Sequence, residues 1–293
     1  MMARLEVFKT YKLFIGGAFP RSESGRSLAV TDAKGEHWAN ASLASRKDVR
    51  DAVLAAGKAL PGWSGKTGYN RAQILYRVAE MLEGRRAQFT EEVARSEGLK
   101  KGAADEVVAK AVDRWVWYAG WADKLGQVFG TVNPVSGPFV NWSAPEPTGV
   151  IGVVAPQGSS LLGLVSRVAP VLAGGNTAVV LAPEAVPLPS ITLAEVLATS
   201  DLPGGVVNIL TGRTAELVPP LAAHMAVHGL DLAGVAPGDA HREAETAAAE
   251  SVKRVTGPVA LDPAGWLDDT RGQDPDWIAT FLELKTVWHP AGV

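Results

Sequence analysis

The stretch "GVIGVVAPQGSSLLGLVSRVAPVLAGGNTAVVL" (149–181) decides the fold. Its first eight residues form a short β-branched run that is stopped by Pro156, which predicts a buried strand. The run 160–175 has the length of a helix and ends at a Gly-Gly pair, and 177–181 is a second β-branched run. A strand, a helix and a strand in this order predict one unit of a parallel sheet.

The same alternation continues toward the C-terminus. The expected elements are a helix over 187–200, a strand over 204–210, a short helix over 214–224 interrupted by Pro219 and Pro220, a strand over 228–235, a helix over 238–252 and a last strand from 253–255. This spacing predicts an α/β fold with a doubly wound, Rossmann-like parallel sheet covered on both faces.

The region before this sheet has helical periodicity. Ser45 followed by Asp48 is a capping-box pattern, and it begins the first of four amphipathic runs. These runs cover 45–63, 70–86, 85–98 and 103–124, and a short strand is expected before them near Leu13 to Ile15. After Val255 the chain is rich in Pro, Gly and Asp, which predicts an irregular connection before an alternating, strand-like run at 281–290.

The bulk composition excludes several classes of function. The chain has 293 residues, and 28 Lys+Arg against 31 Asp+Glu give a formal charge of −3, which provides no electrostatic attraction to nucleic acid or an anionic membrane. The complete absence of cysteine excludes disulfides, thiolate metal sites and cysteine nucleophiles. No run reaches the ~20 apolar residues of a membrane helix, and no signal-peptide core is recognisable, so we expect a soluble, cytoplasmic protein.

Three blocks carry a resemblance to a known family. They are "PTGVIGVVAP" (147–156), "APVLAGGNTAVVLAPEAVPL" (169–188) and "DLPGGVVNILTG" (201–212). In this order and spacing they resemble the coenzyme domain of the aldehyde dehydrogenase superfamily, which implies an NAD-binding type of fold. The ending "LELKTVWHP" (282–290) is similar to the family's C-terminal oligomerisation strand, and its pairing partners are expected between 131 and 143.

The resemblance implies a division of the chain into five parts. These are 1–130 as the N-terminal helical part of the coenzyme-type domain, 131–147 as an oligomerisation hairpin, 148–256 as the Rossmann-like part, 257–277 as an irregular linker and 278–293 as the C-terminal oligomerisation strand. Roughly two dozen residues follow Val255 before the closing strand, far fewer than a further domain of ~100 residues. The family's catalytic domain is therefore expected to be missing, which most resembles the truncated, cysteine-free second module of family 16 aldehyde dehydrogenases.

The resemblance places a residual cofactor site at Pro156, Gln157, Gly158, Glu184 and Gly212. Family members usually follow the proline with Trp-Asn, whose Asn stabilises the oxyanion, but Gln157 and Gly158 stand here. The family's ribose-binding Lys-Pro-Ser-Glu element aligns with 181–184 and keeps only Glu184. The glycine-serine turn that faces the pyrophosphate has Val235 in place of its serine.

The family reaction needs a thiolate, a hydride acceptor and a base for deacylation. The thiol and the segment that carries the base are both missing. A serine needs an adjacent base and an oxyanion hole to replace the thiol, and "GSSLLG" (158–163) is not the hydrolase elbow. We therefore expect no catalytic residue and no required cofactor. Residual NAD binding stays open, while the alternative is that "GGNTAVVL" (174–181) is kept for packing.

Other candidate residues have plainer interpretations. His224 and His228 have zinc-ligand spacing, but Gly229 ends the helix and no third ligand is evident, so solvated or capping histidines and no metal are expected. His241 and Glu245 are expected on an exposed helical face. Trp115, Trp117, Tyr118 and Trp121 crowd one helix, and core packing is the first interpretation. Trp117 cannot share a face with Trp115, which makes Trp117 a candidate for an interface. Trp288 is a second candidate, because Trp is common at binding hot spots.

The leading hypothesis is a non-catalytic aldehyde dehydrogenase homologue that acts as a structural or regulatory subunit. Its partners would be further copies of itself or a catalytic aldehyde dehydrogenase, with no nucleic acid and no membrane. The alternative hypothesis is an NAD(P)-binding, oxidoreductase-like module with residual cofactor binding. A decayed gene product without a role is disfavoured by the regular amphipathic periods.

Overall fold

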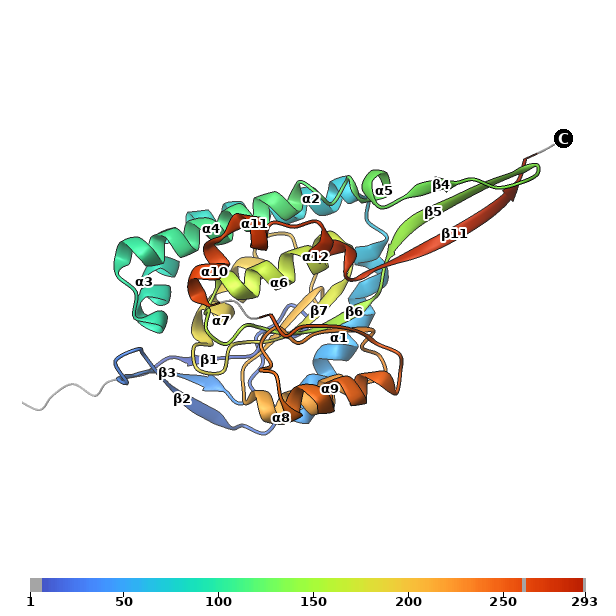
Figure 1. Cartoon of the computed structure of the whole chain (residues 1–293). Coiled ribbons are helices and arrows are strands. Elements are labelled where there is room, and N and C mark those ends of the chain that lie inside the picture. Colours follow the sequence, from blue (N-terminus) through green and yellow to red (C-terminus); the bar gives the residue numbers. More distant parts are fainter. Residues whose placement is uncertain (1–6, 260–261, 292–293) are drawn as a thin grey trace, which may run out of the picture.

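The computed structural model describes residues 7–259 and 262–291, and a five-stranded parallel sheet forms its centre (Figure 1). The strands are β6 (Val150–Val154), β7 (Thr177–Leu181), β8 (Val207–Leu210), β9 (Gly229–Asp231) and β10 (Arg254–Thr256), in the order β10-β9-β6-β7-β8. Every residue of β6, β7, β8 and β9 is buried, as expected for a parallel sheet covered on both faces. The predicted doubly wound α/β fold is confirmed.

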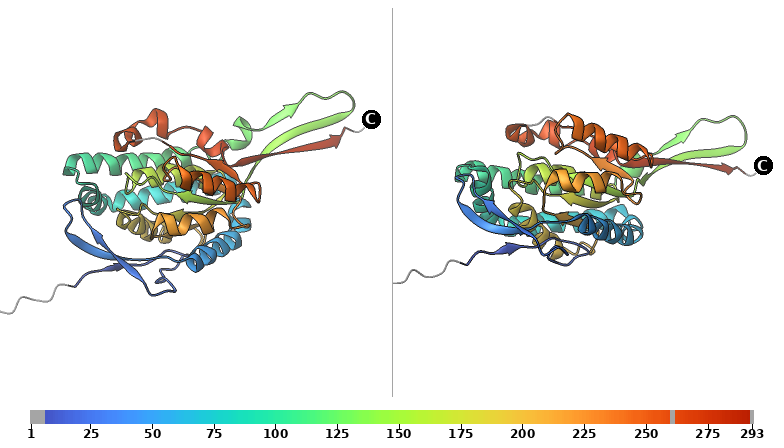
Figure 2. Two further views of the ribbon diagram at one scale, coloured as in Figure 1. Left: turned by 60° about the horizontal axis from the view of Figure 1, so that its bottom comes forward. Right: turned by 90° about the horizontal axis from the view of Figure 1, so that it is seen from below.

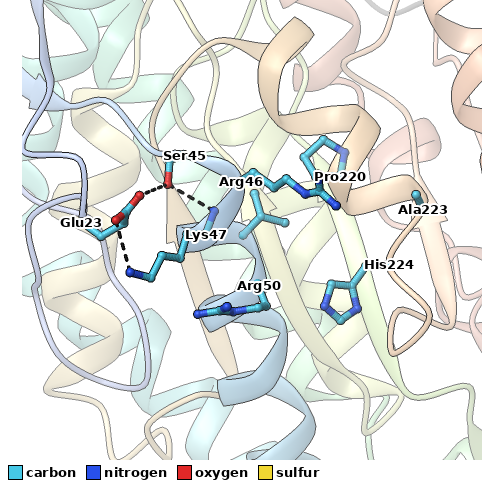
Figure 3. A pocket seen from close by; sticks show the side chains of 9 residues that line it. Glu23, Ser45, Arg46, Lys47, Arg50, Pro220, Ala223 and His224 are labelled. Carbon is cyan, nitrogen blue, oxygen red and sulfur yellow. Dashed lines mark hydrogen bonds and ion pairs between the residues drawn. The ribbon is translucent and has the colours of Figure 1, made fainter.

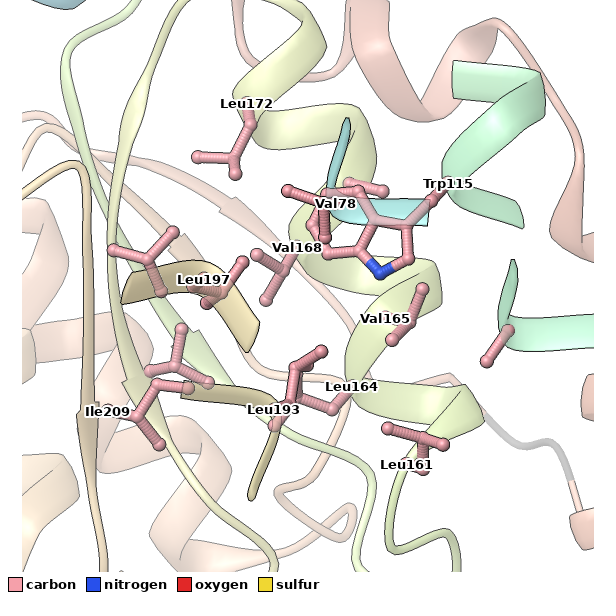
Figure 4. Packing of buried hydrophobic residues seen from close by; sticks show 14 of the residues in the cluster. Val78, Trp115, Leu161, Leu164, Val165, Val168, Leu172, Leu193, Leu197 and Ile209 are labelled. Atoms are coloured by element: carbon pink, nitrogen blue, oxygen red, sulfur yellow. The ribbon is translucent and has the colours of Figure 1, made fainter. Parts of the chain in front are cut away.

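Alternate residues of the strands enter two separate hydrophobic cores. Ile151, Val153 and Ile209 belong to the first, larger core. This core contains the helices α6 (Leu162–Ala173) and α7 (Leu188–Ala198), and Figure 4 shows residues of both helices together with Ile209. All twelve residues of α6 are buried, because other helices cover its outer side as well. Val150, Val154 and Val179 point into the second core, beneath α8 (Thr214–Ala222) and α9 (Asp239–Ala249). This division follows from the two-residue period of a strand.

Four long helices precede the sheet and cover it. They are α1 (Arg46–Ser64), α2 (Gly68–Gly84), α3 (Arg86–Glu97) and α4 (Lys101–Ala119), and a short α5 (Leu125–Val128) follows. The capping box at the start of α1 is confirmed. The Ser45 hydroxyl accepts hydrogen bonds from the N–H groups of Lys47 and Asp48, and the Asp48 carboxylate accepts the Ser45 N–H at 2.8 Å. Helix α1 covers the second core, whereas α2 and α4 pack against α6.

The N-terminal region also contains a three-stranded sheet that the sequence did not predict. Its strands are β1 (Thr10–Tyr11), β2 (Ser27–Thr31) and β3 (His37–Ser42), in the order β1-β3-β2. The strand expected at Leu13 to Ile15 is reduced to isolated bridges, one of which joins Phe14 to Ile209. The expectation of helices behind a single short strand was therefore wrong. The core-facing residues of β3 are alanines, which give too weak a hydrophobic period to indicate a strand.

The segment after β10 is more regular than expected. It contains the short helices α10 (Pro263–Leu267), α11 (Asp269–Gly272) and α12 (Asp276–Ala279), so the expectation of an irregular connection was wrong for much of it. The Arg114 guanidinium is fully buried and donates hydrogen bonds to the Ser166 hydroxyl at 3.0 Å and to the Trp266 carbonyl at 3.2 Å. The Tyr118 hydroxyl donates to the Gly272 carbonyl at 2.9 Å. These contacts dock the segment onto α4 and α6.

A three-stranded arm extends from one end of the body, as both views in Figure 2 show. It consists of β4 (Thr131–Asn133), β5 (Phe139–Pro147) and β11 (Leu282–Pro290), in the order β11-β5-β4. The predicted pairing of the last strand with the hairpin is confirmed, because β11 runs antiparallel to β5 from Leu282↔Pro147 to Pro290↔Phe139. Polar side chains link the strands across one face, where the Ser143 and Thr286 hydroxyls are 2.8 Å apart.

Candidate nucleotide groove and its surroundings

The predicted site residues lie at the carboxyl ends of neighbouring strands. Pro156, Gln157 and Gly158 follow β6, Glu184 follows β7 and Gly212 follows β8. From β6 the chain adds β7 and β8 on one side, and it then continues with β9 and β10 on the other side of β6. The direction in which strands are added therefore reverses between β6 and β9. Ligands of doubly wound sheets bind at such a switch point, outside the carboxyl ends of the strands.

The structure brings Gln157 and Glu184 into direct contact. The Glu184 N–H donates to Gln157 Oε1 at 2.9 Å, and Gln157 Nε2 donates to the Ala155 carbonyl at 2.8 Å. Glu184 Oε2 in turn accepts the N–H of Thr214 at 2.9 Å, at the first residue of α8. Both polar ends of Gln157 and one carboxylate oxygen of Glu184 are therefore engaged within the chain.

These two residues border a groove of about 650 Å³ between α8 and α9, which we call the α8–α9 groove. Its volume is typical of a small-molecule site. The lining consists of Gln157, Glu184, Thr214, Ala215, Val218, Pro219, Ala223, Gly234, Val235, Ala236, Ala240, Glu243, Ala244 and Ala247. Most of these residues were not singled out from the sequence, because small apolar residues on two helices look the same whether they pack or line a groove.

Pro156, Gly158 and Gly212 do not line the α8–α9 groove. Pro156 is buried against the start of α6. A Cβ added to Gly163 in the first turn of that helix would lie 3.1 Å from the Cβ of Pro156. Gly158 is exposed beside it. Gly212 packs closely, because an added Cβ would come within 2.9 Å of the Leu217 side chain. These three residues shape the turns around the site.

The groove fits the nucleoside half of NAD better than its pyrophosphate. The apolar lining and the open carboxylate of Glu184 suit an adenine ring and ribose hydroxyls, respectively. The position of the family's lysine is occupied by the buried Leu181, and the position of the serine in the glycine-serine turn by the buried Val235. None of the lining residues is Lys, Arg or His. The pyrophosphate therefore meets no cation in the groove.

A second cavity, of about 600 Å³, lies at the start of α1 and is lined by Arg46, Lys47, Arg50, His224 and their neighbours (Figure 3). Its cations are largely neutralised. Lys47 pairs with Glu23 at 3.3 Å, and Arg50 pairs with Asp51 at 2.9 Å. Burial, with a contribution from Lys253, holds the pKa of His224 below its usual value, so this ring is neutral at pH 7. The cavity does not attract anions as strongly as its composition suggests.

The histidines act as local hydrogen-bonding groups. His228 Nδ1 accepts the Val150 N–H at 3.0 Å, and His224 Nδ1 accepts the Ala226 N–H at 3.2 Å. Within 7–259 and 262–291, no group of three His, Cys, Asp or Glu side chains is arranged to hold a metal ion. The expectation of an exposed His241 was wrong, since its ring is buried and its Nδ1 lies 3.4 Å from Glu245.

The two candidate interface tryptophans differ in exposure. Trp115 is fully buried, whereas Trp117 is half-buried and packs against Tyr118 and Trp121 with ring centroids 4.8 and 5.4 Å away. Trp288 is 60% exposed near the tip of the arm, and its ring centroid lies 5.9 Å from that of Phe139. Across the part of the chain that the structure describes, no helix is long and apolar enough to cross a membrane.

The parallel sheet, its switch point and the groove beside it define an α/β fold of the dinucleotide-binding class. The aldehyde dehydrogenase family model matches residues 19–257, and the chain belongs to this family. It is 33% identical over 251 residues to a mitochondrial aldehyde dehydrogenase of Leishmania tarentolae, covering 84% of this chain and 49% of that one. It is 35% identical over 208 residues to 2-hydroxymuconic semialdehyde dehydrogenase of Pseudomonas sp. (strain CF600), covering 70% of this chain and 43% of that one.

Solved structures agree with this assignment. HpcC from Thermus thermophilus superposes with a TM-score of 0.78 at 28% identity, over 84% of this chain and 47% of that chain. The NAD+ complex of an aldehyde dehydrogenase from Bacillus cereus superposes with a TM-score of 0.77 at 25% identity, over 84% of this chain and 50% of that chain. The chain spans between a quarter and a half of the length of the curated relatives that it matches, with shares of 26% and 51% for two of them.

Proposed function

We propose that this chain is a non-catalytic aldehyde dehydrogenase homologue, located in the cytoplasm, that serves as a structural or regulatory subunit and docks through its arm to a catalytic aldehyde dehydrogenase. The proposal rests on three features of the chain taken together. The arm and the coenzyme-type sheet are present, the chain contains no cysteine, and three short helices connect β10 directly to β11. In this respect it resembles the second module of the family 16 enzymes.

The absence of cysteine supports the non-catalytic part of the proposal. The serine nearest the predicted site with a carboxylate partner is Ser160, which donates its hydroxyl to Glu97 Oε1 at 2.6 Å. Ser160 is fully buried, so a substrate carbonyl cannot reach its oxygen. Its N–H also donates to the same carboxylate oxygen at 2.7 Å, which makes the pair a structural link between α3 and the turn after β6.

The surface of the arm supports the docking part. Val132, Val140 and Trp142 are exposed on one face of the arm, and Phe139, Leu284 and Trp288 are exposed on the other. Strands β4 and β11 form its two edges, and edge strands offer unpaired backbone groups to a neighbouring chain. An arm with apolar residues on both faces is typical of an interaction surface.

Affinity purification of the tagged protein from its native cell, followed by intact mass measurement of the eluate, tests the proposal. We expect a full-length aldehyde dehydrogenase in stoichiometric amount. The double substitution V132K and W142K should abolish its capture, whereas M225K, which changes an exposed methionine on the body, should leave capture unchanged. A monomer without any dehydrogenase partner would refute the proposal, and a homo-oligomer alone would refute its accessory-subunit part.

The alternative function is that of an NAD(P)-binding module, and one observation favours it. Glu184 borders a groove of suitable size and keeps one carboxylate oxygen open for a ribose hydroxyl. A saturable NAD titration that is lost in Glu184→Ala would support this alternative. A flat titration would remove it.

A further inference from the structure

Strand β11 forms one border of the arm, and no strand of the described residues pairs with its outer side (Figure 1). Two hydrogen bonds at the ends of the β5–β11 ladder show which backbone groups face outward. The Thr148 N–H donates to the Phe281 carbonyl at 3.2 Å, and the Ala291 N–H donates to the Pro138 carbonyl at 2.8 Å. Because such bonds recur at every second residue, the odd-numbered residues of β11 bond to β5. The backbone groups that face the free edge belong to Leu284, Thr286 and Trp288.

The opposite edge of the arm is less suited to pairing. Strand β4 has only three residues, and it covers β5 from Asn141 to Ser143. Beyond that point β5 carries Pro145 and Pro147, whose nitrogens face this edge but have no hydrogen to donate. Prolines of this kind protect sheet edges against pairing with other chains. Strand β11 therefore offers the longer unprotected edge.

The sequence of β11 is complementary to itself when a second copy pairs with it in antiparallel direction about Thr286. The exposed Leu284 then lies opposite the exposed Trp288 of the second copy, and the two-fold symmetry repeats this apolar contact. On the other face, the Glu283 carboxylate lies opposite His289 of the second copy. The outward N–H and carbonyl groups of the two strands face each other in this register.

One hydrogen bond at the base of the arm favours this register over its neighbour. Arg254 Nη1 donates to the outward-facing Leu282 carbonyl at 2.9 Å and so occupies it. With the axis at Thr286, Leu282 lies opposite Pro290 of the second copy, which has no N–H that needs this carbonyl. An axis at Lys285 would instead set a backbone N–H against the occupied carbonyl. It would also place the two Lys285 side chains directly opposite each other, which is unfavourable.

We propose that two copies of this chain pair through β11 about a two-fold axis at Thr286 and form one six-stranded antiparallel sheet. The partner at the free edge is thus a second copy of the same chain. The pairing uses the edge of the arm, and it does not use the face that carries Val132, Val140 and Trp142. The proposal goes beyond the accessory-subunit function, and it holds with or without a bound dehydrogenase.

Light scattering of the purified full chain tests the pairing. We expect a dimer, and Thr286→Pro should convert it to a monomer because it removes the central outward N–H. The matched control is Val132→Pro, which removes an outward N–H from β4 at the opposite edge and should leave the dimer intact. Circular dichroism and thermal unfolding check that both variants are folded. A monomeric native protein, or a dimer that survives Thr286→Pro, would overturn the proposal.

The complete absence of native cysteine allows the register to be measured directly. Opposite residues of a hydrogen-bonded antiparallel pair have Cα atoms about 5.5 Å apart, which is within the range of a disulfide. Under mild oxidation, Thr286→Cys should therefore give a covalent dimer, whereas Lys285→Cys, which marks an axis one residue away, should not. No cross-linking of Thr286→Cys, or equal cross-linking of the two variants, would refute the pairing about Thr286. Neither result would affect the capture of a dehydrogenase, which is tested separately.

Discussion

Arg167 of α6 and Asp231 at the end of β9 form an ion pair inside the protein, with Arg167 Nε 2.5 Å from Asp231 Oδ2. Both side chains are almost completely buried. The other oxygen of Asp231 accepts the Ala233 N–H at 3.0 Å, and the Arg167 guanidinium lies 3.9 Å above the ring of Trp277. The pair therefore joins the sheet, α6 and the docked segment that follows β10.

Breaking this pair should destabilise the fold strongly. Arg167→Met leaves the Asp231 carboxylate buried without its cation, and we expect a loss of about 3–5 kcal/mol in the free energy of unfolding. The double variant Arg167→Met with Asp231→Leu removes both charges and should lose less than the single variant. Urea unfolding of the native protein, both single variants and the double variant measures this difference, and an additive loss in the double variant would show that the two charges are not coupled.

Two tryptophans on α4 should respond differently to truncation. Trp115 is fully buried, so Trp115→Ala should cost about 3–5 kcal/mol of stability, whereas Trp117→Ala should cost clearly less because that ring is half-buried. Thermal unfolding ranks the two variants. If Trp117 meets another chain, its variant also shifts the oligomeric state measured by light scattering, which Trp115→Phe should not do.

Two glycines provide a matched pair of opposite effects. A Cβ on Gly234 would lie 2.0 Å from the Ala155 carbonyl oxygen, while nothing lies within 4 Å of one added to Gly57 in α1. We expect Gly234→Ala to destabilise the protein by about 1–3 kcal/mol through overpacking. Gly57→Ala should stabilise it by about 0.5–1 kcal/mol, because alanine favours the helix. Similar melting temperatures for the two variants would contradict this account.

Stability should fall in mildly acidic solution. Burial, with a contribution from Lys253, lowers the pKa of His228 below its ordinary value of 6.5. The unfolded chain then binds the proton more readily, so this contribution is present above about pH 6.5 and is lost as the pH falls toward the folded-state pKa. Protonation of Nδ1 would also remove its acceptance of the Val150 N–H.

The loss of unfolding free energy between pH 7.5 and pH 5.5, compared between the native protein and His228→Asn, isolates this effect. Buried carboxyl groups such as Glu97, whose pKa is raised by burial, contribute equally to both proteins and cancel. The native protein should show the steeper decline. Identical declines would exclude a role for His228.

The sequence predicted the central sheet because its strands are buried on both faces and read as continuous β-branched runs, as in β6 and β7. The small N-terminal sheet was missed because Ala39 and Ala41 fill the buried positions of β3. Helices α10 to α12 were missed because they are stabilised by residues far away in the sequence. Arg114, for example, donates hydrogen bonds to the Trp266 carbonyl and to the Asp269 carboxylate.

The predicted site was partly accessible to sequence reasoning. Gln157 and Glu184 were identified from the resemblance, and the structure brings them within hydrogen-bonding distance of each other. The remainder of the α8–α9 groove depends on how two helices that are separated by residues 223–238 approach each other, which no local pattern encodes.

The pairing within the arm also determines when the arm can form. Ser143 and Thr286, whose hydroxyls meet across β5 and β11, are separated by 143 positions in the chain. Closing so long a loop is entropically costly until the intervening sheet and helices have folded and brought its ends together. The complete arm is therefore a late product of folding. A partner that recognises all three strands would bind the fully folded protein and not partly folded chains. Assembly would therefore depend on the completion of folding.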